Sequence, residues 1–176
     1  MNHPGRARTL PQDKKMKKGL LALLGVALVA VVAYMALFAG SPAPQVNYTS
    51  LNGQAASTES LKGKVVLVNF WATSCPGCVE EMPEIKKMHQ EFAGKGYETI
   101  AVALSYDPPN YVKSFVDKYQ LPFFVALDSN GEIAKAFGDI QLAPTTFLID
   151  KQGKIIKRYV GVMDFKEVRK LVQQHL

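Results

Sequence analysis

The sequence predicts an α/β domain with a central mixed sheet and helices on both of its faces, preceded by one transmembrane helix. Two observations support the domain: apolar, β-branched runs alternate with helical patterns after residue 47, and the last two such runs are joined by a short turn. A third supports the membrane helix, because twenty consecutive residues near the N-terminus carry no charge. The expected parts are a basic tail at 1–18, an anchor at 19–40, a linker at 41–47 and the domain at 48–176.

The uncharged run Leu20–Ala39 is long enough to cross a bilayer, since a helix rises ~1.5 Å per residue and the hydrocarbon core is ~30 Å thick. Six Lys and Arg residues and one Asp precede it, and the rest of the chain carries only one of the six net positive charges. The positive-inside rule places this tail in the cytoplasm and the domain on the far side of the membrane. The alternative is a cleaved signal peptide, but the run exceeds a signal peptide's apolar region and Leu37-Phe38-Ala39 is a poor cleavage site. The near-neutral domain gives no indication of a nucleic-acid partner.

The Pro-rich, uncharged residues 41–47 are typical of a short extended linker. A strand, a helix and a second strand follow. Residues 64–71 (KVVLVNFW) and 97–104 (YETIAVAL) are apolar and β-branched, as in strands buried on both faces. Residues 76–93 repeat apolar side chains on one helical face and end in a glycine-containing turn. Because such crossovers are right-handed, these two strands should be parallel neighbours.

The middle of the chain continues the alternation. Asp107-Pro108-Pro109 opens a helix that runs to about Tyr119, with aromatic residues four apart on one face. A strand at 123–127 ends in the turn Asp128–Gly131, and a short helix follows at 132–137.

The last elements make the sheet mixed. Strands at 145–150 and 154–160 are joined by Lys151-Gln152-Gly153, which indicates an antiparallel hairpin. Asp164 is the expected N-cap of a final helix at 165–174. The complete order is therefore β-α-β-α-β-α-β-β-α.

The only two cysteines, Cys75 and Cys78, lie where the first of these strands meets the first helix. A thiol at a helix N-terminus faces unpaired backbone N–H groups and the positive end of the helix dipole, and both favour the nucleophilic thiolate. Pro76 suits the first helical turn, where its missing N–H would be unpaired anyway. We expect Cys75 to be the exposed, attacking thiol and Cys78 the shielded thiol that resolves a mixed disulfide.

A structural disulfide or a metal site would explain the same cysteines less well. A disulfide across three residues constrains little of the unfolded chain. Zinc usually takes four ligands, and the three histidines, His3, His89 and His175, offer no evident partner. His89 is expected at the surface or half-buried on the helix after the cysteines. No metal is therefore predicted, although a copper or zinc chaperone stays open as an alternative.

Two segments, residues 69–78 (NFWATSCPGC) and 143–150 (APTTFLID), resemble the thioredoxin superfamily, most of all the TlpA/ResA/CcmG-like branch of membrane-anchored thiol–disulfide oxidoreductases. The resemblance covers residues ~45–176 and extends to the anchor. It implies a thioredoxin-like fold whose redox centre is the Cys75–Cys78 disulfide, with no other cofactor. Pro144 matches the family's cis-proline, which lies against the cysteines and presents the Ala143 backbone to a substrate.

The resemblance also implies a role for Glu81, which matches a partly buried acid thought to exchange protons with the thiols. A carboxyl in an apolar pocket has a raised pKa and can serve near neutral pH. The alternative is a solvated helix face. Where cytoplasmic thioredoxins carry Asp, this chain has Asn69, which cannot titrate, and the usual Trp before the first cysteine is Ser74. Trp71 and Pro76 are expected beside the active site as part of the substrate-binding surface, though core packing alone would also explain Trp71.

By this resemblance the protein reduces disulfides of exported proteins, with apocytochrome c haem-site cysteines as the expected substrate. Electrons would come from a membrane donor that passes thiol equivalents, because no dinucleotide-binding or P-loop motif is visible. The expected location is the inner membrane, with the domain facing the periplasm or cell exterior. Alternatives are a disulfide oxidase or isomerase and a peroxiredoxin-like peroxidase, although Thr73 lies two residues before Cys75 and not the three that the peroxidase motif needs.

Overall fold

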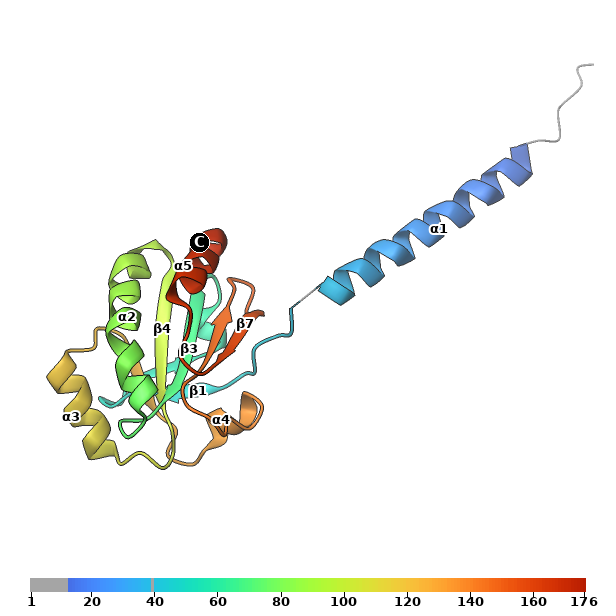
Figure 1. Ribbon diagram of the computed structural model, residues 1–176. Helices are drawn as coiled ribbons and strands as arrows, with labels where there is room; N and C mark the ends of the chain where they lie inside the picture. The colour runs from blue at the N-terminus through green and yellow to red at the C-terminus, as the bar shows by residue number, and fades with distance from the viewer. Residues whose placement is uncertain (1–12, 39) are drawn as a thin grey trace, which may run out of the picture. The chain divides into compact units, whose positions relative to one another are not determined.

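The computed structural model describes the backbone of residues 13–38 and 40–176 (Figure 1). These residues form two separate units, helix α1 (Asp13–Phe38) and a domain that begins at Gly40. Of the helices within the described residues, none combines the length and the apolar character needed to cross a membrane. The predicted span at 19–40 therefore stays a prediction, and most of the predicted basic tail lies outside the described residues.

The domain is built on a five-stranded mixed sheet with the strand order β5-β4-β3-β6-β7. The central strand β3 is parallel to β4 and antiparallel to β6, which confirms the predicted mixed sheet and the predicted hairpin of β6 and β7. Every residue of β3 is buried, as its unbroken apolar pattern predicts. The bounds are β3 (Val65–Trp71), β4 (Tyr97–Ala103), β5 (Phe124–Leu127), β6 (Thr145–Ile149) and β7 (Ile155–Val160).

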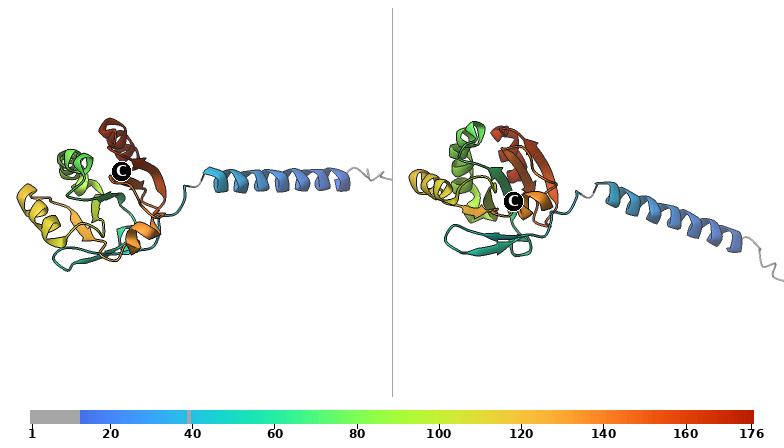
Figure 2. Two further views of the ribbon diagram at one scale, coloured as in Figure 1. Left: turned by 60° about the horizontal axis from the view of Figure 1, so that its bottom comes forward. Right: turned by 90° about the horizontal axis from the view of Figure 1, so that it is seen from below.

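Both faces of the sheet are covered, as predicted (Figure 2). Alternate β3 side chains divide between two cores: Val65, Leu67 and Trp71 on one face, Val66, Val68 and Phe70 on the other. The first core packs against α2 (Pro76–Phe92), α3 (Pro109–Tyr119) and α5 (Phe165–His175). The second packs against α4 (Glu132–Ala136), the short 3-10 helix η1 (Glu59–Leu61) and Tyr48. A second 3-10 turn, η2 (Ala93–Lys95), follows α2 and ends at Gly96 with a φ of 89°, which a glycine adopts without strain.

The sequence predicts no element between residues 47 and 63, where the structure has a β-hairpin and η1. A hairpin of β1 (Asn47–Thr49) and β2 (Ala55–Ser57) precedes the main sheet, and a bridge between Ser50 and Ala126 joins it to β5. Its strands are three residues long and follow no clear apolar alternation, so the sequence carries little signal for them.

The segment just after α1 is bonded to the domain. The Ile155 N–H donates to the Ser41 carbonyl and the Ala43 N–H donates to the Gly153 carbonyl, both at 2.8 Å. A Cβ at Gly40 would lie 2.7 Å from the Ile155 carbonyl oxygen, so the chain passes β7 too closely for any side chain there. The first residues of the predicted linker thus form part of the edge of β7.

Candidate active site

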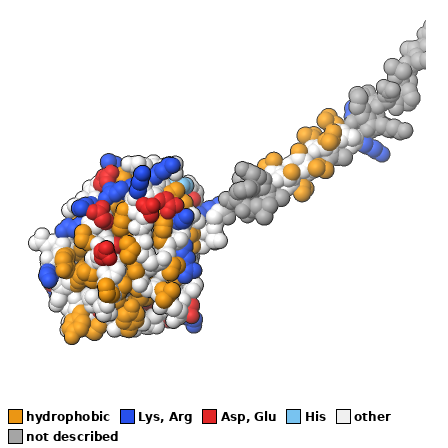
Figure 3. Space-filling model, in the orientation of Figure 1, with side chains coloured by type: hydrophobic (Ala, Val, Ile, Leu, Met, Phe, Trp, Pro, Cys, Tyr) orange, Lys and Arg blue, Asp and Glu red, His pale blue; other side chains and the backbone are white. Residues whose placement is uncertain are grey.

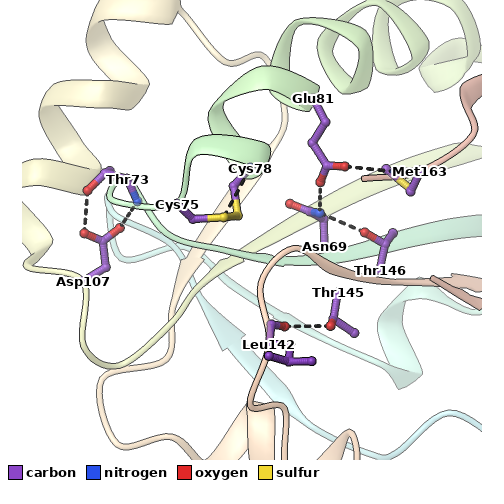
Figure 4. Close-up of a disulfide and its surroundings, with 10 residues drawn as sticks. All are labelled: Asn69, Thr73, Cys75, Cys78, Glu81, Asp107, Leu142, Thr145, Thr146 and Met163. Carbon is purple, nitrogen blue, oxygen red and sulfur yellow. Dashed lines mark hydrogen bonds between the residues drawn. A yellow bond between two sulfur atoms is a disulfide. The ribbon is translucent and has the colours of Figure 1, made fainter. Parts of the chain in front are cut away.

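Cys75 and Cys78 form a disulfide at the N-terminus of α2, directly after β3 (Figure 4). Cys75 is the N-cap residue, and its Sγ accepts a hydrogen bond from the Cys78 N–H at 3.2 Å. Pro76 occupies the first helical position, as predicted. Cys75 is half-buried, whereas the Cys78 side chain has no exposed surface. Cys75 is therefore the more accessible of the two sulfurs and Cys78 the shielded one, in the order that the sequence predicts, although Cys75 is only partly exposed.

The peptide bond between Ala143 and Pro144 is cis, as the resemblance implies. Pro144 lies next to Gly77, the residue before Cys78, because a Cβ at Gly77 would be 3.6 Å from Pro144 Cδ and 3.1 Å from Val162 Cγ2. Pro144 is buried and Ala143 half-buried, while Leu142 is 64% exposed and Val162 51% exposed. The loops that carry Ala143 and Val162 thus bring apolar surface to the cysteine-bearing turn.

Glu81 lies on α2 three residues after Cys78, and its side chain is 1% exposed, so the solvated alternative is wrong. Its Oε1 accepts a bond from Asn69 Nδ2 at 2.8 Å, and its Oε2 accepts one from the Met163 N–H at 3.4 Å. Burial raises the pKa of Glu81 to about 7, although the two hydrogen bonds act in the opposite direction. A carboxyl with such a pKa can exchange a proton near neutral pH.

Asn69 links Glu81 to the sheet. The amide is fully buried, and its Nδ2 also donates to Thr146 Oγ1 at 2.9 Å. Its Oδ1 has no hydrogen-bond partner among the described residues. The sequence indicated that Asn69 cannot titrate but did not indicate its contact with Glu81, because that contact joins β3 to α2.

Two expectations need correction. Trp71 was expected on the substrate-binding surface, but it has no exposed surface and packs against Phe115 at a ring-centroid distance of 5.1 Å. It belongs to the core and cannot touch a docked chain in this structure. His89 is buried and not at the surface: its ring packs edge-on against Phe123 at 5.5 Å, and desolvation lowers its pKa.

Sequence reasoning missed a second carboxylate near the cysteines. Asp107, read only as the opening of a helix, is 5% exposed and accepts two hydrogen bonds from Thr73, one from the backbone N–H and one from Oγ1, each at 2.6 Å. Figure 4 shows this pair on one side of the disulfide and the Glu81–Asn69 group on the other. No signal in the sequence marks the pair, because the two residues are 34 positions apart.

Among the described residues no group of three or more His, Cys, Asp or Glu side chains is placed to hold a metal ion. On the face of the domain in Figure 3, Lys and Arg side chains lie among Asp and Glu side chains rather than in a basic patch.

The candidate active site offers a redox-active sulfur pair, a buried carboxyl with a raised pKa and an apolar surround. These groups suit thiol–disulfide exchange.

Comparison with known proteins agrees with this chemistry. Residues 38–174 match the Redoxin family. A thiol-disulfide oxidoreductase ResA of Bacillus thuringiensis subsp. konkukian is 43% identical over 122 residues, which cover 69% of each chain. The ResA of Halalkalibacterium halodurans is 34% identical and covers 90% of this chain and 92% of its own. A thiol:disulfide interchange protein of the thioredoxin family from Chlorobium tepidum shares the fold with a TM-score of 0.71 at 28% identity, covering 77% of this chain and 96% of its own.

Proposed function

This chain belongs to the Redoxin family and is a thiol–disulfide oxidoreductase, and we propose that it reduces disulfides of exported proteins through Cys75 and Cys78. The observation that carries the proposal is the placement of the two sulfurs. Cys75 caps α2 at the surface, and Cys78 lies one turn inside with no exposed atoms.

The reaction begins with both cysteines reduced. The Cys75 thiolate attacks one sulfur of the substrate disulfide, so that a Cys75–substrate bond forms and the substrate's S–S bond breaks with release of one thiolate. Cys78 then loses its proton and attacks the Cys75 sulfur. This step breaks the mixed disulfide, releases the second substrate thiolate and leaves Cys75 and Cys78 oxidised. The substrate gains two electrons and the protein loses two.

Glu81 is the proposed proton acceptor for Cys78. It lies one turn further along α2, away from solvent, and a carboxyl with a pKa of about 7 is partly ionised at neutral pH. Asn69 and the Met163 N–H keep this carboxyl in place by donating to its two oxygens.

The substrate is proposed to dock as an extended segment along Ala143, next to the cis bond to Pro144. Pro76 and Ser74 are exposed on the cysteine-bearing turn and would line the same surface. Apocytochrome c with its haem-site cysteines oxidised is the proposed physiological substrate, by resemblance to the ResA-like branch.

The protein is proposed to be anchored in the inner membrane by residues 19–40, with the domain in the periplasm or outside the cell. The basic tail and the uncharged run Leu20–Ala39 support this topology. An extracytoplasmic space is oxidising, so a reductase there needs electrons from a membrane donor that passes thiol equivalents. The Cys75–Cys78 disulfide is proposed as the redox centre, without a further cofactor.

Insulin reduction by the full-length chain in detergent tests this function. We expect Cys75→Ser to abolish turnover and Cys78→Ser to accumulate a mixed disulfide between Cys75 and the insulin chain, seen by non-reducing electrophoresis and mass spectrometry. Full activity of the Cys75→Ser protein would overturn the proposal. The measured reduction potential separates a reductase from an oxidase, because a reductase needs a potential near that of thioredoxin, about −270 mV, rather than the −120 mV of a strong oxidant.

A further inference from the structure

We propose that Asp107 is a positioning residue for the nucleophile: by holding Thr73 it fixes the turn that places Cys75 at the N-terminus of α2. The inference rests on the proposed nucleophile Cys75 and concerns a residue that does not touch the sulfurs itself.

The hydrogen bonds between Asp107 and Thr73 hold these two residues together. Both oxygens of the Asp107 carboxylate are used, since Oδ2 accepts from the Thr73 N–H and Oδ1 from the Thr73 hydroxyl, each at 2.6 Å. The side chain is 5% exposed, so water competes little for these bonds. None of the ion pairs within the described residues involves Asp107, and its hydrogen bonds are therefore not shared with a Lys or Arg. Charge-assisted bonds to a carboxylate are stronger than bonds between neutral groups.

Thr73 lies in the short segment that joins β3 to α2. The end of β3 is held to the neighbouring strand by the Leu104 N–H, which donates to the Trp71 carbonyl at 3.0 Å. Further along, the Cys75 N–H donates to the Ala72 carbonyl at 3.2 Å, and this bond closes a turn inside the segment. For residues 72–74, the described hydrogen bonds to another part of the chain are the two that reach Asp107.

Asp107 is itself well fixed. Its N–H donates to the Leu104 carbonyl at 2.9 Å, and Pro108 and Pro109 follow it at the start of α3. Proline has a restricted φ, so the backbone beyond the carboxylate has little freedom. The carboxylate thus joins the loops that follow two adjacent parallel strands, β3 and β4, at the same edge of the sheet.

The position of Cys75 matters because its sulfur interacts with the N-terminus of α2. Its Sγ already accepts from the Cys78 N–H at 3.2 Å in the disulfide form. In the reduced form the same N–H and the helix dipole stabilise the thiolate, and this effect falls off within the first turn. If Thr73 is released, the turn can move and the sulfur loses part of this stabilisation. The pKa of the Cys75 thiol should then rise.

The test is the rate at which reduced full-length protein in detergent is alkylated at Cys75 by iodoacetamide, measured as a function of pH. We expect Asp107→Asn and Thr73→Val each to move the pH profile upward and to slow alkylation at pH 7, by up to about tenfold for a one-unit rise of the thiol pKa. Thr73→Ser keeps both donors and should retain the original profile.

Asp128→Asn is the matched control. Asp128 is also a buried carboxylate after a strand, and its two oxygens accept from the Ile133 and Ala134 N–H groups at 3.0 and 2.8 Å at the start of α4. Its loss should lower the melting temperature without changing the alkylation profile. An unchanged profile in folded Asp107→Asn and Thr73→Val, or an equal change in Asp128→Asn, overturns the inference. If Asp107→Asn does not fold, Thr73→Val, which removes only the hydroxyl bond, decides the question. Alkylation needs no protein substrate, so the outcome is independent of whether insulin is reduced.

Discussion

The side-chain amide of Asn69 donates to Oε1 of Glu81 at 2.8 Å, so the buried carboxyl behind the disulfide is held by a group that cannot titrate. Cytoplasmic thioredoxins have Asp at this position. In this chain such an Asp would place two carboxyls in direct contact, and the pair would have to share a proton. The amide therefore leaves Glu81 as the titrating group at this point of the core.

This contact predicts the effect of Asn69→Asp. The two carboxyls should titrate as a coupled pair, with one apparent pKa raised well above that of Glu81 alone, because two like charges this close cannot both form easily. Carbon-13 NMR of labelled carboxyl groups in the oxidised protein measures both steps. Asn69→Ala, which removes the amide without adding an acid, is the control. Two independent titrations in Asn69→Asp, each with an ordinary carboxyl pKa, would contradict the prediction.

The raised pKa of Glu81 predicts the pH dependence of the resolving step. Because an ionised carboxylate accepts the Cys78 proton, the rate should rise with pH through about 7, the pKa of Glu81. In Glu81→Gln this rise should disappear, and the rate at pH 8 should fall by about a hundredfold, at the lower end of general base effects. Stopped-flow measurement of mixed-disulfide decay follows the step. Glu84→Gln changes a more exposed glutamate of the same helix, paired with Lys87, and should leave the profile as it is.

The same pKa shift predicts a pH dependence of stability. Burial raises the folded-state pKa of Glu81 from 4.5 to about 7, so the folded protein binds the proton more tightly than the unfolded chain does. The favourable contribution is complete below pH 4.5 and is lost as the pH rises through 7. The loss amounts to about 3 kcal/mol, since one pKa unit corresponds to about 1.4 kcal/mol.

Urea unfolding of the oxidised protein at pH 4.5 and pH 8 measures this loss. The free energy of unfolding of wild type should fall between the two pH values by more than that of Glu81→Gln, which lacks the titrating group. Equal pH dependence in the two proteins would show that Glu81 has an ordinary pKa in the fold.

Several features of the site were predictable because they depend on local sequence. The strand that ends at Trp71, the helix that begins at Pro76 and the two cysteines at the start of that helix follow from a continuous stretch of chain. The cis bond at Pro144 followed from resemblance. The Asn69–Glu81 and Thr73–Asp107 contacts were not predictable, because each depends on how separate elements are rotated and on where a loop turns. The burial of Trp71 depends likewise on packing against α3.

The close approach of Gly77 to Val162 allows a steric test of the active-site turn. A Cβ there would lie 3.1 Å from Val162 Cγ2, closer than an ordinary contact, so Gly77→Ala requires Val162 to move. This overpacking opposes the gain of about 1 kcal/mol that Ala has over Gly inside a helix. We therefore expect Gly77→Ala to be clearly more favourable to stability in a Val162→Ala background, which removes the opposing methyl groups, than in wild type. Equal effects in both backgrounds, measured by urea unfolding, would show that the two side chains do not meet.

Removal of the first 39 residues tests the proposed anchor. The uncharged run Leu20–Ala39 should hold full-length protein in the membrane fraction through an alkaline carbonate wash, because no peripheral contact survives that treatment.

A chain that starts at Gly40 should be released and should keep insulin reduction, since the domain unit begins there. A chain that starts at Tyr48 should also be released but should be less stable, because it lacks the bonds that Ser41 and Ala43 make to Ile155 and Gly153, each worth about 1 kcal/mol. Release of full-length protein by the carbonate wash would contradict the proposed anchor. It would not affect the proposed chemistry of the domain, because the disulfide, Glu81 and Pro144 all lie beyond Gly40.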